Sequence, residues 1–152
     1  MDLEEQYDKI YRYCYFKLHQ RETAEDITQE TFLRFFENSR YPKSREAMRL
    51  LYTIARNLCV DEYRRHKTEH LEEEPEAVDS FAEESMVTRL SVKMALATLD
   101  EEERELLLLR YVNEVPMSVI SSLYGISRFA AYRKIMQAVK NLRSRLREED
   151  FV

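Results

Sequence analysis

Three stretches in the first half of the chain place apolar side chains at the three-to-four-residue spacing of an amphipathic helix. We predict helices over residues 3–18, from Thr23 to about Asn38, and over about 46–66. Thr23 is expected to cap the second helix, because Asp26 follows at the spacing of a capping box. The expected core positions are Leu3, Tyr7, Ile10, Cys14, Ile27, Phe32, Phe35, Phe36, Leu50, Leu51, Ile54, Leu58 and Val60.

Two segments interrupt this periodicity. Residues 38–45 are predicted to form a loop, because Pro42 disfavours helical geometry at Tyr41. Residues 68–84 are acidic, have little apolar periodicity and are predicted to be a solvated linker. Helical spacing restarts at about Ser85, and the expected core stripe there is Val87, Leu90, Met94 and Ala97.

The second half of the chain carries the signals of a helix-turn-helix. Asp100 is predicted to cap a helix that ends near Asn113, with acidic residues in its first turn, where the helix dipole favours them. A short helix then begins at Pro116 and ends at Gly125, the single glycine of the chain. Glycine adopts the left-handed conformation of this turn without a Cβ penalty, and Ser127 is placed to cap the next helix.

That last helix, predicted over about 128–147, is strongly basic. Ser121 is small enough to let the two helices cross closely, and Ile120 and Ile126 are placed to fill their junction. A plain helical hairpin with a solvated basic face is the alternative. We favour DNA binding, because the small residue, the glycine and the cap stand at helix-turn-helix offsets before a basic helix. The residues expected to face the core are Ala131, Ile135, Ala138 and Leu142.

Composition and charge agree with a helical protein that meets nucleic acid in two places. One glycine and three prolines among 152 residues favour helices throughout, so the fold class is all-α. The net charge is −5, but its distribution matters more. Residues 41–67 carry seven basic and three acidic side chains, residues 68–105 carry three and thirteen, and residues 106–152 carry eight and four. We therefore expect two small domains, 1–67 and 85–152, joined by the acidic linker 68–84.

Signs of catalysis or membrane insertion are few. The histidines make no metal-ligand spacing with Cys14 and Cys59, and no glycine loop could hold phosphates, so we expect no enzyme and no cofactor. The two distant cysteines suit buried thiols in a reducing compartment. No apolar run is long enough for a membrane span, and the acidic N-terminus is unlike a signal peptide. We expect a cytoplasmic protein.

Three segments, in chain order, resemble parts of the extracytoplasmic-function sigma factors. Residues 24–34 (AEDITQETFLR) resemble the helix that docks on core RNA polymerase, and residues 51–65 (LYTIARNLCVDEYRR) resemble the promoter-melting helix. Residues 106–146, beginning LLLLRY, resemble the domain that binds the upstream promoter element. The resemblance implies a transcription initiation factor with two tethered helical domains that read the −10 and −35 elements.

The resemblance also implies partners and sites in the first domain. Asp26, Gln29, Glu30 and Leu33 form one stripe that suits a basic partner helix, which in the family is the clamp helix pair of the polymerase β′ subunit. The β subunit and an anti-sigma factor are further implied partners. In the family, the loop and helix that follow capture a base flipped from the melted strand, which draws attention to Tyr41, Asn57 and Asp61. Arg64 and Arg65 belong to the basic end of that helix and are further DNA-binding candidates. The stripe can also be an ordinary solvated face, and Asn57 and Asp61 can instead serve structure.

The helix after the turn supplies the −35 candidates. Arg128, Tyr132, Arg133 and Gln137 are expected to face the major groove, with Lys134 and Lys140 flanking toward phosphates. Several positions depart from the family pattern. Leu50 stands for a usual tryptophan, Glu114 for a usual glycine, and residues 129–131 (Phe-Ala-Ala) for a usual Gly-Thr-Val run. Basic family positions are replaced by Met136, Gln137 and Val139.

Two other functions fit parts of the sequence. A stand-alone helix-turn-helix regulator would bind palindromic operators as a dimer and would need no polymerase-docking face. A helical adaptor or sequestering protein would use the helix-turn-helix only as structure. Binding to core polymerase, followed by transcription from a matched promoter, distinguishes a sigma factor from both.

Overall fold

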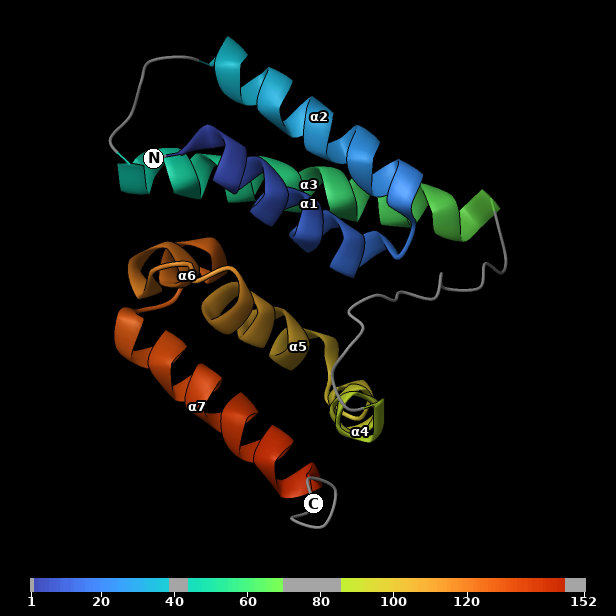
Figure 1. Cartoon of the computed structure of the whole chain (residues 1–152). Helices are drawn as coiled ribbons and strands as arrows, with labels where there is room; N and C mark the ends of the chain where they lie inside the picture. Colours follow the sequence, from blue (N-terminus) through green and yellow to red (C-terminus); the bar gives the residue numbers. More distant parts are fainter. Residues whose placement is uncertain (1, 39–43, 70–85, 147–152) are drawn as a thin grey trace. The chain divides into compact units, whose positions relative to one another are not determined.

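The computed structural model describes residues 2–38, 44–69 and 86–146, and within these ranges the chain is helical with no strand. The chain divides into two compact units, Met1–Ala77 and Val78–Val152 (Figure 1). None of the described helices has an apolar stretch long enough to cross a bilayer.

The described residues of the first unit form three long helices that pack on one another (Figure 1). They are α1 (Leu3–Leu18), α2 (Arg21–Glu37) and α3 (Ser44–Glu69). Each buries one face and leaves the opposite face in solvent, as the 3.6-residue helical period requires. The buried apolar side chains are Ile10, Tyr13, Cys14, Ala24, Phe32, Phe35, Ala47, Leu51, Tyr52, Ala55 and Cys59.

Aromatic rings and small side chains alternate in this core. Tyr13 of α1 meets Tyr52 of α3 edge to face, with ring centroids 5.6 Å apart, and Tyr7 lies 5.3 Å from Phe32 of α2. Edge-to-face and tilted ring pairs are favourable arrangements for buried aromatics. Buried Thr28 donates its hydroxyl hydrogen bond to the Ala24 carbonyl oxygen of its own helix at 2.7 Å. The hydroxyl group of Thr28 is therefore satisfied although it is buried.

The two cysteines lie in this core as buried thiols that are not joined by a disulfide. A hydrogen bond with Cys59 lowers the pKa of the Cys14 thiol, burial raises it, and a hydrogen bond with Thr28 lowers it again; the net pKa lies below the usual value. The expectation of buried thiols is confirmed, and the contact joins α1 to α3.

The first helix is confirmed at both ends, but the predicted start of the second helix is wrong. Gln20 precedes α2 as its N-cap, and Thr23 lies inside the helix and donates a hydrogen bond to the Gln20 side chain at 2.8 Å. The predicted core stripe of α3 is only partly right, because Leu51 is buried but Leu50, Ile54, Leu58 and Val60 are half-buried. Leu3 and Phe36 are exposed. Tyr41 lies outside the described residues.

In its described residues the second unit contains four α-helices and one π-helical turn. These are α4 (Met86–Ala97), α5 (Glu101–Leu107), the π-helical turn η1 (Leu108–Val112), α6 (Met117–Tyr124) and α7 (Arg128–Arg145). Leu99, Leu107 and Ala138 form one buried cluster, against which the half-buried Leu96, Val139 and Leu142 pack. This cluster holds the long helix α7 against α4 and α5.

The turn between α6 and α7 has the predicted chemistry. Gly125 ends α6 at φ 66°, and its N–H together with that of Ile126 donates to the carbonyl oxygens of Ser122 and Ser121. This pair of bonds is the Schellman pattern. Ser127 then caps α7 by accepting a hydrogen bond from the Ala130 N–H at 3.0 Å. Ala131, Ile135 and Ala138 are buried and Leu142 is half-buried, which confirms the predicted inward face of α7.

One prediction in this unit needs correction. Met94 is 63% exposed and Ala97 is also exposed, whereas Ala95 and Leu99 are buried, so the predicted core positions Met94 and Ala97 are wrong. The side chains of Val87 and Leu90, the other two positions of that stripe, lie outside the described ones. The helix that begins at Asp100 ends near Asn113 as predicted, and its last turn widens into η1. The Asn113 N–H donates to the Leu108 carbonyl oxygen, five residues back.

The segment after η1 generates a prediction about backbone strain. Glu114 has φ 55°, a left-handed conformation that costs a residue with a Cβ about 1–2 kcal/mol. Glu114→Gly should therefore raise the free energy of unfolding by about 0.5–1 kcal/mol after the added chain entropy is subtracted. Gly125→Ala should lower it by about 0.5–1 kcal/mol after the same entropy correction, and this loss should be purely conformational, because nothing lies within 4 Å of an added Cβ. Urea unfolding followed by circular dichroism measures both, and shifts of the same sign would contradict the assignment.

Candidate nucleic-acid and polymerase interfaces

The predicted docking stripe lies on the outer face of α2. Asp26, Gln29 and Leu33 are exposed, Leu33 to 59%, and Glu30 is half-buried. Glu30 accepts from Arg34, one turn on, at 2.9 Å. The face opposite this stripe carries the buried residues Ala24, Thr28, Thr31 and Phe35. The structure therefore brings the four predicted residues together on one solvent-facing, acidic surface with an apolar side chain at its end.

The predicted melting residues lie at the C-terminal part of α3. Asn57, Asp61 and Arg64 are exposed and follow one another at i, i+4 and i+7, so they share one face. Arg65 is also exposed and donates to Glu62 at 2.6 Å. That face points away from the buried Ala55 and Cys59. Asn57 and Asp61 therefore do not contribute to the core of the first unit.

The predicted groove-facing residues lie on the outer face of α7. Arg128, Tyr132, Arg133, Lys134, Gln137 and Lys140 are all exposed. No acidic residue occurs in residues 128–146, so the whole face is positive or neutral. The Arg133 guanidinium lies 5.0 Å from the centroid of the Phe129 ring, and Gln137 donates to Asn141 at 3.0 Å. These contacts restrain two of the predicted base-reading side chains.

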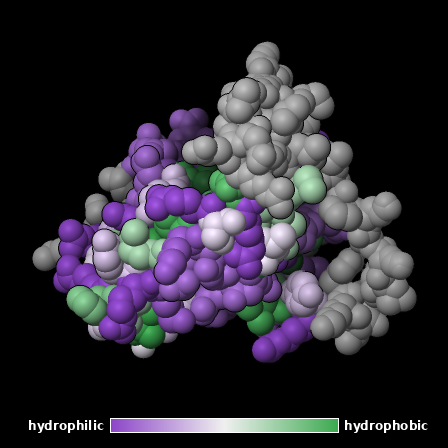
Figure 2. Space-filling model, turned by 90° about the horizontal axis from the view of Figure 1, so that it is seen from below, coloured by the Kyte–Doolittle hydropathy of each residue, from purple (hydrophilic) through white to green (hydrophobic). Residues whose placement is uncertain are grey.

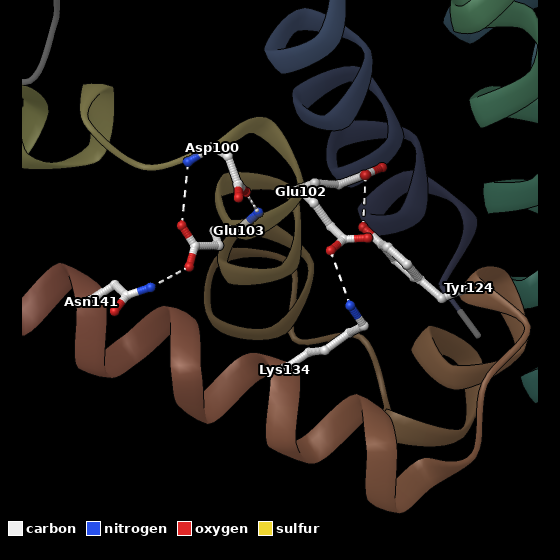
Figure 3. A network of polar contacts seen from close by, with 7 residues as sticks. Asp100, Glu102, Glu103, Tyr124, Lys134 and Asn141 are labelled. Atoms are coloured by element: carbon white, nitrogen blue, oxygen red, sulfur yellow. Dashed lines mark hydrogen bonds and ion pairs between the residues drawn. The ribbon is translucent and has the colours of Figure 1, made fainter.

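Acidic side chains at the start of α5 hold α7 in place (Figure 3). Asp100 accepts from the Glu103 N–H at 2.9 Å, and the Glu103 side chain accepts from the Asp100 N–H, forming a capping box. The same Glu103 carboxylate accepts from Asn141 of α7, and Lys134 pairs with Glu102 at 3.2 Å. The acidic first turn of α5 therefore makes two side-chain contacts with the basic helix α7, one from Glu102 and one from Glu103.

Comparison with known proteins gives one family match in each of the two units. The Sigma-70 region 2 family matches residues 3–69, and the Sigma-70, region 4 family matches residues 95–144. The chain is 27% identical to the ECF RNA polymerase sigma factor SigW of Bacillus subtilis, over 93% of this chain and 84% of that protein. The chain belongs to the extracytoplasmic-function (ECF) sigma factors.

Two further similarities support this sigma factor's family and fold. The chain is 30% identical to the ECF sigma factor BldN of Streptomyces coelicolor, but it spans only 60% of that longer protein. The fold is similar to that of the sigma factor RpoE from Bartonella quintana, solved in complex with the anti-sigma factor NepR. The TM-score is 0.70 at 17% identity, with 91% of this chain and 90% of that chain covered.

Its function follows from its family. The sigma factor binds core RNA polymerase and directs promoter recognition and transcription initiation. The region 2 match lies within the first unit, and the region 4 match lies within the second unit and contains the whole turn at Gly125.

Sequence reasoning missed two residues of the α7 outer face. Phe129 is 69% exposed and Met136 is 40% exposed, and both lie on the side opposite the buried Ala131, Ile135 and Ala138. The helical period could have placed them there, because they stand two residues before Ala131 and one residue after Ile135. From the sequence, both residues are known only as departures from the family pattern, and no contact is predicted for them.

The contacts between α5 and α7 generate a prediction about the sigma factor's stability. Glu103→Ala removes one half of a capping box and the bond to Asn141, and should lower the free energy of unfolding by about 2 kcal/mol. Glu102→Ala removes an ion pair whose side chains are 45% and 49% exposed, and should cost only about 0.5 kcal/mol. Both variants lose one first-turn carboxylate, so the dipole contribution cancels in the comparison. Equal losses in urea unfolding would show that the capping box and the bond to Asn141 contribute no more than the exposed ion pair.

Proposed function

We propose a division of labour between the units. Residues 1–67 dock on core polymerase and hold the melted −10 element, residues 68–84 span the two units, and residues 85–152 bind the −35 element. The observation that carries the proposal is that all described candidate residues lie on outward faces, none of them needed for a core. The protein acts by binding, and no catalytic role is proposed for any side chain.

The proposed polymerase site is the α2 stripe of Asp26, Gln29, Glu30 and Leu33. Carboxylates at the rim and one exposed leucine suit a basic amphipathic helix pair, such as the clamp helices of the β′ subunit. Glu30 is already paired with Arg34, so Asp26 should contribute more to a new ion pair. Leu33 supplies apolar area that only a partner can bury.

The proposed −10 site is the exposed face of Asn57, Asp61, Arg64 and Arg65, together with Tyr41. Amide and carboxylate groups can hydrogen-bond the edges of an unpaired base, and the two arginines can neutralise adjacent phosphates. The proposed −35 site is the α7 outer face of Arg128, Tyr132, Arg133, Lys134, Gln137 and Lys140. Its first turns would enter the major groove, where arginine and glutamine can bond guanine and adenine.

The proposal includes the compartment in which the factor acts and a class of protein that regulates it. The factor works in the cytoplasm, where it meets core polymerase, whose β subunit is a further contact. A protein inhibitor of the anti-sigma class is a proposed regulator, supported by the NepR complex of the structurally similar RpoE.

Reconstitution tests the division of labour. The full chain should co-purify with core polymerase and start transcription from a matched promoter, and alone it should bind duplex DNA weakly, because each basic block is small. Tight, sequence-specific binding by the isolated chain to a palindromic site, without polymerase, would favour the stand-alone regulator.

Docking gives the first prediction from this proposal. Asp26→Lys combined with Leu33→Ala should weaken the affinity for core polymerase by at least about tenfold, because it reverses one charge and removes the exposed apolar anchor. Helicity should stay unchanged, since both side chains are exposed. Labelled-protein titration with core polymerase measures the affinity.

Glu25→Lys is the matched control. It makes the same charge reversal on α2 at an exposed position, one residue before Asp26 and therefore about 100° away around the helix. If the control and the double variant lost equal affinity, the effect would be general charge repulsion and the stripe would not be the docking site.

The Glu102–Lys134 ion pair gives a second prediction. Glu102→Gln releases Lys134 from its carboxylate partner, which should strengthen promoter binding by the polymerase–sigma complex and steepen the dependence of log Kd on log salt by about one unit. Glu101→Gln removes the same charge one residue earlier, outside this ion pair, and should leave the slope nearly unchanged. Filter binding over a salt series measures the slope for both variants. Identical slopes would show that Lys134 does not contact a phosphate.

A further inference from the structure

An apolar stripe runs along the outer face of α7. Phe129, Tyr132 and Met136 are 69%, 54% and 40% exposed, and they follow one another at i, i+3 and i+7. Phe129 has the highest exposed fraction among the large apolar side chains of the described residues. On the face of the molecule shown in Figure 2, apolar residues form separate patches on a mostly hydrophilic surface. Large side chains gathered on one stripe indicate a surface that a partner covers.

The position of the stripe narrows the choice of partner. It begins two residues after the cap at Ser127, in the first turn of the helix that follows the helix-turn-helix turn. Arg128 flanks it on one side and Arg133 on the other, and Lys140 lies one turn beyond Met136. Residues 128–146 contain no acidic side chain. The complementary surface is therefore apolar along its middle and negatively charged along both edges.

The major groove of duplex DNA has this pattern where it contains thymine. Each thymine presents its 5-methyl group to the groove, and phosphates line both rims. The Arg133 guanidinium lies 5.0 Å from the Phe129 ring centroid, an arrangement that holds the ring at the surface and keeps a positive charge beside it. The ring can then contact a methyl group while the cations contact the rims.

We propose that Phe129, Tyr132 and Met136 read the 5-methyl groups of thymines in the upstream promoter element, so that part of the specificity comes from methyl burial instead of hydrogen bonds. This inference rests on the proposed placement of α7 in the major groove. It assigns a role to Phe129 and Met136 beyond the polar candidates of that helix.

The test uses the complete sigma factor bound to core polymerase. A duplex is first selected by this complex from a library randomised in the upstream element, and its thymines are then replaced one at a time by deoxyuridine. Deoxyuridine keeps every base-pairing group and removes only the 5-methyl group. Burial of one methyl group corresponds to about a fourfold change in Kd. We expect that loss at one or more positions.

Variants assign the effect to the stripe. With Phe129→Ala, the thymine and deoxyuridine duplexes should bind equally at the position that Phe129 contacts. Lys140→Ala should weaken both duplexes by the same factor, because a phosphate contact does not depend on the methyl group. Met94→Ala, which removes a side chain 63% exposed on α4, should change neither. Circular dichroism checks that each variant is folded.

The outcomes separate the two proposals. If Lys140→Ala weakens binding but deoxyuridine has no effect at any position, or the selected element contains no thymine, α7 binds DNA and the methyl reading is wrong. The methyl reading is also wrong if Phe129→Ala weakens both duplexes equally, as expected of a stripe that serves a protein partner or the backbone. If no upstream sequence is selected and Lys140→Ala has no effect, the proposed placement of α7 itself fails.

Discussion

The left-handed turn at Gly125 is the constraint on which the second unit depends. The bonds from Gly125 and Ile126 back to α6 fix the direction of the chain, and Ser127 starts α7 immediately afterwards. Once the start is fixed, the helical period decides which side chains enter the core and which face outward. A turn longer by one residue would rotate α7 by about 100° and would present a different set of side chains to DNA.

Local chemistry explains which elements could be predicted from the sequence. The caps at Asp100, Gly125 and Ser127 act over three or four residues, so their signals lie next to one another in the chain and were read correctly. The start of α2 was misplaced because Thr23 has the right residue type for a cap, whereas Gln20 does not. The buried face of α4 depends on its packing against α7, which no local pattern encodes.

The features of the candidate sites also fall into two groups, those that the sequence predicts and those that only the folded chain creates. The outward positions of Asp26, Asn57 and Arg133 follow from helical periodicity and were predictable. The contacts of Lys134 with Glu102 and of Asn141 with Glu103 join residues more than thirty positions apart, and only the folded chain brings them together. The exposure of Phe129 follows from the same helical period, since Phe129 stands outside the inward set of Ala131, Ile135 and Ala138, but no polar group marked it as a candidate contact.

The proposed phosphate contact of Lys134 would have a kinetic consequence, because Lys134 pairs with Glu102. On that proposal, Lys134 joins a phosphate only after it leaves a carboxylate of its own domain, so a chance encounter with genomic DNA gains less than the count of basic residues suggests. A weaker encounter ends sooner, which shortens the time spent on unrelated sequence. Glu102 would thereby limit the dwell time on such sequence without contacting DNA itself.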